Sequence, residues 1–239
     1  MSTVLSFDTS ADYCAAALVR DGVAVAAESV AMSRGHAEAL VPLVQDLCAG
    51  AKLAFSDIDM IGTTVGPGSF TGVRTGIAAA KGFALAAGCP AIGVSSLHAV
   101  AFGVRHGGAS KTLVLLDTRR DDFFVQLFLA NAEPAQAPRV LDAAGVRDLL
   151  REHAAIVTGN ALDRWREVCD PDDLAKTEVL EGAGVPDPVD VATLAERILD
   201  TVGVAPDTLS PLYLRAPEAK IPPGGGRLKM TSDGGADRN

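Results

Sequence analysis

An internal repeat constrains the fold of this chain more than any other sequence feature. The segment TVLSFDTSADYCAAALV at residues 3–19 aligns without a gap on TLVLLDTRRDDFFVQLF at residues 112–128. Both copies contain an Asp-Thr pair, at residues 8–9 and 117–118, and their apolar positions agree. Each copy predicts a buried strand, a turn and a returning strand. This self-similarity predicts a duplicated α/β lobe, and two unrelated hairpins of similar composition remain the alternative.

Helix signals follow each copy of the repeat. In the first half, residues 36–49 carry an amphipathic apolar stripe, and residues 73–87 form a helical pattern rich in Gly and Ala. The second half has helical patterns at residues 143–152 and from Asp187, which is followed by a proline typical of a first helical position. The predicted units are an N-terminal lobe at 1–107, a C-terminal lobe at 108–215 and a disordered tail at 216–239.

Composition restricts the function classes that fit. The 239 residues are 48% apolar and carry a formal net charge of −9, which fits a globular chain and argues against a large nucleic-acid surface. No apolar run approaches the ~20 residues that a bilayer span needs, and the first strand begins at Thr3. A cytoplasmic location without membrane contact is therefore expected. The four cysteines lie far apart in the sequence and are expected to be reduced.

The stretch GPGSFTGVRTG at residues 66–76 lies between a short apolar strand and the second helix. It is not a Walker A loop, because Val and Arg follow Gly72 where Lys and Ser or Thr are needed. It is not a dinucleotide fingerprint either, since one residue too many separates its second and third glycines. Two interpretations stay open: a turn capped by Ser69 or Thr71 that lets a helix pack closely, or a phosphate site.

The first Asp-Thr turn is the candidate phosphate site. In phosphotransferases built from two such lobes, this turn presents N–H and hydroxyl groups to phosphates, while an Asp binds a magnesium water or acts as base. The candidates here are Asp8, Thr9 and Ser10. The second turn has two arginines and no glycine, and no Gly-Gly pair follows it to seat an adenine nucleotide. We interpret the first turn as a vestigial phosphate site; a small-molecule kinase or ATPase using Asp8 is the alternative function.

Four segments carry a resemblance to a known family: the opening strand through residues 8–10, the glycine stretch at 66–74, GVSSL at 93–97 and PLYLR at 211–215. Together they resemble the TsaB (YeaZ) family of bacterial accessory proteins. The resemblance implies a duplicated actin, sugar-kinase and Hsp70-type (ASKHA) fold with a shortened second lobe. It also implies a non-catalytic scaffold or activator, required when the paralogue TsaD transfers threonylcarbamoyl to N6 of adenosine 37 in ANN-decoding tRNAs.

The resemblance implies partners as well. They are TsaD in a heterodimer, the ATPase TsaE, tRNA through the complex, and a second copy of this chain when it is alone. ATP and threonylcarbamoyl-AMP are then handled by the partner subunits, so no cofactor is expected here. TsaD carries two metal-binding histidines on a helix, and the matching positions here hold Ser96 and Val100, with His98 between them. No catalytic residue and no metal site are therefore expected.

The resemblance places the partner interface on the two helices of the first lobe. Small residues along the second helix allow close helix approach, although burial against the lobe's own sheet is the alternative. A charge at Leu43 or Ala79 is expected to abolish heterodimerisation with TsaD and leave the monomer folded. The predicted interface residues are His36, Leu40, Leu43, Leu47, Ser69, Phe70, Thr71, Arg74, Ile77 and Ala80.

Overall fold

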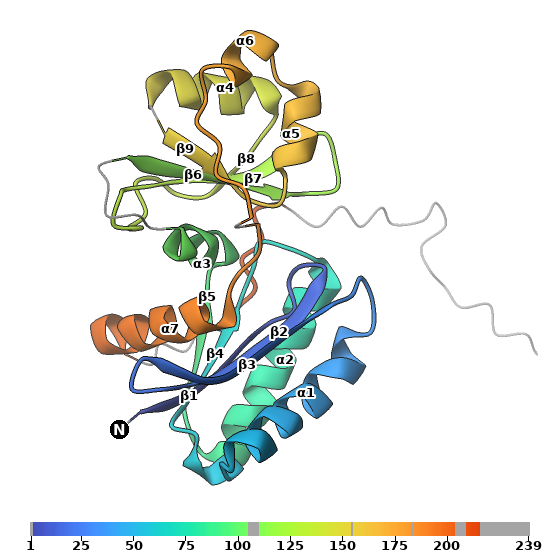
Figure 1. Cartoon of the computed structure of the whole chain (residues 1–239), viewed down its shortest axis with the longest axis vertical. Helices are drawn as coiled ribbons and strands as arrows, with labels where there is room; N and C mark the ends of the chain where they lie inside the picture. The colour runs from blue at the N-terminus through green and yellow to red at the C-terminus, as the bar shows by residue number, and fades with distance from the viewer. Residues whose placement is uncertain (1, 105–109, 154, 183, 204–208, 216–239) are drawn as a thin grey trace, which may run out of the picture.

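The structure is a computed structural model that describes residues 2–104, 110–153, 155–182, 184–203 and 209–215. These residues form two α/β lobes, one above the other in Figure 1. The first sheet has the strand order β3-β2-β1-β4-β5, and the second has the order β8-β7-β6-β9. The second order repeats the first without its last strand. The predicted duplication with a shortened second lobe is therefore confirmed for the described residues, and the alternative of two unrelated hairpins is wrong.

The first lobe follows the predicted order of elements. Asp21 and Gly22 have φ angles of 50° and 76°, which are typical of the two-residue turn that joins paired strands, and Arg20 pairs with Val23 across it. Its elements are β1 (Thr3–Asp8), β2 (Tyr13–Arg20), β3 (Val23–Ala31), α1 (His36–Ala51), the 3-10 turn η1 (Phe55–Asp57), β4 (Met60–Thr64), α2 (Phe70–Ala87), β5 (Ala91–Val94) and α3 (Ser96–Gly103).

The second lobe contains two short elements that the sequence did not predict, β8 and α6. Helix α7 begins as predicted: the Asp187 carboxylate accepts a hydrogen bond from the Val189 amide at 2.8 Å, and Pro188 is its first residue. The elements are β6 (Lys111–Asp117), β7 (Phe123–Phe128), β8 (Arg139–Leu141), α4 (Ala143–Glu152), β9 (Ala155–Thr158), α5 (Leu162–Val168), α6 (Pro171–Leu174) and α7 (Pro188–Val202).

The two hairpins differ in register by one residue. Asp8 pairs with Ala15 across the first turn, whereas the equivalent Asp117 pairs with Phe123 across a turn one residue shorter. The gap-free alignment therefore holds for β1 and β6 but is wrong for the returning strands. Turn length sets the register of an antiparallel pair, so an identity such as Leu18 with Leu127 does not mark equivalent positions.

Helix α7 packs on the first sheet, although it lies far along the chain in the range 108–215 (Figure 1). The Ser6 hydroxyl on β1 donates a 2.6 Å hydrogen bond to the carbonyl of Pro188 at the start of α7. Gly62 on β4 leaves room for the side chains of Val191 and Ala195. The predicted lobe boundary near residue 107 and the predicted tail at 216–239 lie outside the described residues.

Three groups of buried side chains hold the layers together. Helices α1 and α2 cover one face of the first sheet. Helices α3 and α7 lie between the two sheets and share one core with both of them, and α4 and α5 cover the far face of the second sheet (Figure 1). The lobes are therefore joined by a continuous apolar core. None of the described helices combines the length and the apolar character that crossing a membrane requires.

Candidate functional site

The candidate site lies where β1 and β4 end, facing the second lobe. These strands are parallel neighbours, so the Asp8–Ser10 turn after β1 and the loop after β4 meet at one edge of the sheet. Ligands of α/β sheets bind at this edge. Helix α2 begins at Phe70, three residues earlier than predicted, and Ser69 caps it by accepting a 3.2 Å hydrogen bond from the Gly72 amide.

Three glycines bring α2 into direct contact with the Asp8–Ser10 turn. A Cβ atom at Gly68 would lie 2.6 Å from the Ser10 carbonyl oxygen, and one at Gly72 would lie 2.0 Å from that of Thr9. A Cβ at Gly76 would lie 2.8 Å from the Thr9 hydroxyl oxygen. Gly72 and Gly76 lie one turn apart on α2, and Gly68 lies just before the helix, so the glycine stretch serves close packing.

Hydrogen bonds also join the start of α2 to the Asp8–Ser10 turn. The Thr9 hydroxyl donates to the Gly72 carbonyl at 2.8 Å, and the Ser69 amide donates to the Ser10 carbonyl at 2.8 Å. Asp8 and Thr9 are each only 1% exposed, and Ser10 is 4% exposed. The start of α2 therefore packs directly on this turn, and the Thr9 hydroxyl that was predicted to meet a phosphate bonds to α2 instead.

Asp8 is a buried carboxyl group supported by two donors. The Thr64 hydroxyl and the Ser10 amide both donate to its Oδ1 atom, the second at 3.0 Å. Burial raises the pKa of Asp8, because it disfavours the charged form, and these hydrogen bonds only partly oppose the shift. The carboxyl is therefore suited to a structural role in the turn.

The raised pKa predicts a pH-dependent contribution of Asp8 to stability. The folded protein binds this proton more tightly than the unfolded chain, so the contribution is present below the unfolded-state pKa of 3.8 and is lost as pH rises through the folded-state value. Asp8→Asn cannot ionise and is expected to flatten the fall in unfolding free energy above pH 4, measured by urea denaturation. Asp163→Asn, at a 97% exposed side chain, is the control. An unchanged pH profile in Asp8→Asn would contradict the assignment.

The second Asp-Thr turn is held by an arginine that the sequence did not single out. The Arg164 guanidinium pairs with Asp117 at 3.0 Å and donates to the carbonyls of Arg120 and Asp122. It also lies 4.4 Å from the centre of the Phe123 ring. The Arg164 guanidinium therefore occupies the second turn. The sequence alone does not reveal this contact, because Arg164 lies on α5, far along the chain from the turn.

A cleft of about 280 Å³ separates the two turns. Arg119 of the second turn reaches across it to Asp12 of the first at 2.6 Å, and both side chains are more than half exposed. On the floor of the cleft, the Ser10 and Ser96 hydroxyl oxygens lie 3.2 Å apart. The cleft keeps the position of a nucleotide site, whereas its polar groups contact one another.

Comparisons with known proteins decide the family. Residues 29–145 match the family TsaD, tRNA N6-adenosine threonylcarbamoyltransferase. The chain is 39% identical over 122 residues to the tRNA threonylcarbamoyladenosine biosynthesis protein TsaB of Escherichia coli, covering 51% of this chain and 52% of that protein. It is 30% identical to the solved structure of YeaZ from Pseudomonas aeruginosa, with a TM-score of 0.76, covering 90% of this chain and 100% of that one. The chain belongs to the TsaB (YeaZ) family.

The extent of the match differs between these relatives. The aligned segment spans about half the length of the E. coli TsaB protein, whereas the whole of the Pseudomonas YeaZ chain is covered. A ROK hexokinase from Thermus thermophilus shares the fold, with a TM-score of 0.51 at 14% identity, covering 83% of this chain and 99% of that one. Together these structures confirm the predicted ASKHA fold.

Five of the ten predicted interface residues are buried inside this TsaB-family chain. Their side chains are 0–7% exposed and pack in the first lobe's own core. The prediction that they face a partner is therefore wrong in the folded chain: their apolar stripes are the core faces of α1 and α2. They are Leu40, Leu43, Leu47, Ile77 and Ala80.

The other five predicted residues lie at or near the surface. Phe70 is 54% exposed, and Thr71 and Arg74 are exposed beside it, whereas Ser69 is half-buried. His36 is half-buried, with its Nε2 3.0 Å from the Ala11 carbonyl oxygen. Further along α2, the exposed face continues through residues that the sequence did not single out as contacts: Ala78, Gly82 and Leu85. The Leu85 side chain is 86% exposed.

The positions that correspond to the TsaD metal ligands are part of the core. Ser96 is 1% exposed and Val100 is 2% exposed. His98 stacks on Phe128, with ring centres 5.7 Å apart, and burial lowers its pKa. Burial also raises the pKa of the Cys14 thiol to about 11, and all four cysteines are free. Across the described ranges, no cluster of three or more His, Cys, Asp or Glu side chains is arranged to hold a metal ion.

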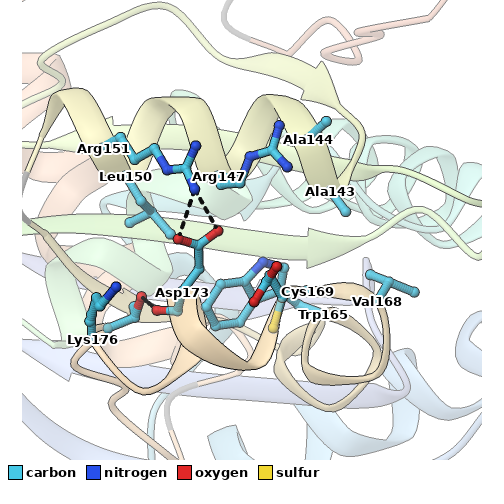
Figure 2. Close-up of a pocket in the computed structure, with 12 residues that line it drawn as sticks. Ala143, Ala144, Arg147, Leu150, Arg151, Trp165, Val168, Cys169, Asp173 and Lys176 are labelled. Atoms are coloured by element: carbon cyan, nitrogen blue, oxygen red, sulfur yellow. Dashed lines mark hydrogen bonds and ion pairs between the residues drawn. The ribbon is translucent and has the colours of Figure 1, made fainter.

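A second cavity, of about 460 Å³, lies in the second lobe between α4 and the α5–α6 region (Figure 2). Arg151 reaches across from α4 to Asp173, with nitrogen–oxygen distances of 3.1 and 3.2 Å, and Trp165 forms part of the opposite wall. Neither Asp-Thr turn lines this cavity. It is therefore separate from the candidate site at the end of β1.

Proposed function

We propose that this TsaB-family chain acts in the biosynthesis of threonylcarbamoyladenosine in tRNA as a non-catalytic activator of a TsaD-type transferase. The family relationship supports the pathway, because the E. coli relative is named for it. The observation that carries the non-catalytic role is the Asp8–Ser10 turn of the first lobe, in which the Asp8 and Thr9 side chains are buried and hydrogen-bonded within the chain. The proposal assigns ATP and threonylcarbamoyl-AMP to partner subunits and places the complex in the cytoplasm.

The burial of this turn argues against the alternative of a kinase or ATPase. Phosphoryl transfer needs a carboxylate within reach of a magnesium ion and donors directed at the phosphate oxygens. Asp8 is almost fully buried, so it is not within reach of a solvent-held magnesium ion, and burial raises its pKa. Two of the turn's donors are already used within the chain: the Thr9 hydroxyl donates to the Gly72 carbonyl, and the Ser10 amide donates to Asp8. No observation favours unaided nucleotide turnover.

The exposed faces of α1 and α2 support pairing with a related subunit. The match to the TsaD family spans both helices, at residues 29–145. Related subunits commonly pair by presenting the same patch to each other, as in isologous dimers. On α2 the exposed face combines Arg74 and Lys81 with small or apolar residues, and the small residues permit close helix approach. The proposed partners are TsaD, TsaE and, through the complex, tRNA, with a homodimer when the chain is alone.

Reconstitution tests the proposal. Two reactions are compared, one with this chain and one without it. Both contain purified TsaD and TsaE from the same organism, ATP, threonine, bicarbonate, an enzyme that makes threonylcarbamoyl-AMP, and unmodified tRNA. Modified adenosine is measured by mass spectrometry. We expect modification to fall at least tenfold when the chain is omitted. Calorimetry with Mg-ATP is expected to give no tight binding to the chain alone. Undiminished modification without the chain, or ATP turnover by the chain alone, would refute the proposal.

A further inference from the structure

Three side chains form a stack at the start of α2. The guanidinium carbon of Arg74 lies 3.5 Å from the centre of the Phe70 ring and 5.7 Å from that of Tyr213. The two rings are 5.8 Å apart and inclined by 26°. Arg74 Nε also donates a 2.8 Å hydrogen bond to the Tyr213 hydroxyl. We call Phe70, Arg74 and Tyr213 the aromatic–arginine stack.

The backbone that carries Tyr213 is fixed on both sides of the tyrosine. The Leu212 amide donates to the Val65 carbonyl at 2.8 Å, and the Leu212 side chain packs against a small cluster under α2. Arg215 forms an ion pair with Asp122 in the second lobe. Tyr213 is therefore held in place before any partner arrives, which reduces the entropy lost on binding.

The stack is open to solvent. Phe70 is 54% exposed and Tyr213 is 48% exposed. Within the part of the chain that the structure describes, the two terminal nitrogens of Arg74 form no hydrogen bond or ion pair. Exposed Tyr and Arg side chains held rigidly are the residues that most often dominate protein interfaces. A free guanidinium end recognises a carboxylate through two parallel hydrogen bonds.

We propose that Tyr213 is a partner-contact residue, and that the aromatic–arginine stack anchors an acidic side chain and its apolar neighbour from the TsaD-type subunit. This inference rests on the proposed function. The stack continues the docking face proposed above, because Phe70 and Arg74 begin the exposed row of α2 that runs on through Ala78, Gly82 and Leu85. The C-terminal segment at residues 211–215 thereby becomes part of the interface.

A protein partner fits the charges better than a stacked RNA base does. The chain carries a net charge of −9, whereas RNA binding draws on several Lys and Arg side chains around the stacking platform. The nearby Arg215 is already paired with Asp122. Among the described residues, the two terminal nitrogens of Arg74 have no hydrogen-bond partner, and this guanidinium end beside two rings suits a single carboxylate.

The proposal is tested by measuring, with calorimetry, the affinity of this chain for the purified TsaD subunit from the same organism. Tyr213→Ala is expected to weaken binding at least tenfold, with the melting temperature of the free chain lowered by no more than a few degrees. Tyr213→Phe keeps the ring and loses only the hydroxyl, so a smaller loss is expected. Tyr13→Ala changes the chain's other tyrosine, which is 37% exposed, and is expected to bind within twofold of wild type.

Crosslinking separates a contact role from a structural one. A photoreactive benzoylphenylalanine at position 213 is expected to capture TsaD in the complex, whereas the same residue at position 13 is not. Wild-type affinity of Tyr213→Ala, or crosslinking at position 213 to tRNA and not to TsaD, would overturn the inference and leave the proposed function intact. A wild-type chain that does not bind TsaD at all would overturn both.

Discussion

Gly72→Ala is expected to destabilise the protein by about 3 kcal/mol or more, because the new methyl group would overlap with backbone. The Cβ would lie 2.0 Å from the Thr9 carbonyl oxygen, and neither β1 nor α2 can move without breaking the packing around them. Such a loss is a large share of the 5–15 kcal/mol that stabilises a typical domain. Chemical denaturation followed by circular dichroism measures it.

Gly82→Ala provides the matched control on the same helix. A Cβ at Gly82 would meet no atom within 4 Å. Alanine is the better helix former by about 1 kcal/mol, so this variant is expected to be slightly more stable than wild type. Equal destabilisation of both variants would show that α2 does not pack on the Asp8–Ser10 turn as described.

Leu85→Arg is expected to abolish the complex with the TsaD subunit and leave the free chain folded. Leu85 is 86% exposed, so the change alters the stability of the free chain by roughly 0.5 kcal/mol or less. In a close helix interface the same charge would be buried without a partner, which corresponds to a loss of affinity of about a hundredfold or more. Analytical ultracentrifugation of the mixed subunits measures this loss.

Two further variants complete this experiment. Val202→Arg, at a 66% exposed position near the end of α7, is expected to leave the complex intact. Leu43→Asp is expected to unfold the chain, because Leu43 is 7% exposed and packs in the core under α1. The burial of Leu43 argues against the sequence-based expectation that a charge there leaves the monomer folded. Unaltered assembly of Leu85→Arg would refute the proposed docking face.

The sequence was sufficient to predict the lobe architecture. The repeated Asp-Thr strands and the Asp187 cap depend on contacts between near neighbours in the chain, and both appear where they were predicted. The register of β7 was missed because it depends on one residue of turn length. Short elements such as β8 and α6 carry too few residues for a periodic signal.

The candidate site was less predictable, because it depends on contacts that are distant in the sequence. An apolar stripe on a helix marks its buried face but does not say whether a sheet or a partner covers it, which is why Leu40 and Leu47 were assigned to an interface. The stack of Arg74 on Tyr213 joins residues 139 positions apart. The hydrogen bonds from Arg164 to the carbonyls of Arg120 and Asp122 in the second turn join residues 44 and 42 positions apart. No local pattern encodes either contact.

The return of α7 to the first sheet has a consequence for biogenesis. A ribosome releases β1 early, yet the face of that strand bearing Ser6 stays uncovered until the helix that starts at Pro188 has emerged. The first lobe therefore cannot finish folding during its own synthesis, and most of the second lobe is made in the interval. A nascent chain that stops before α7 would leave an apolar face of the first sheet exposed to solvent. The first lobe therefore depends on synthesis of the second, and the two lobes finish folding together.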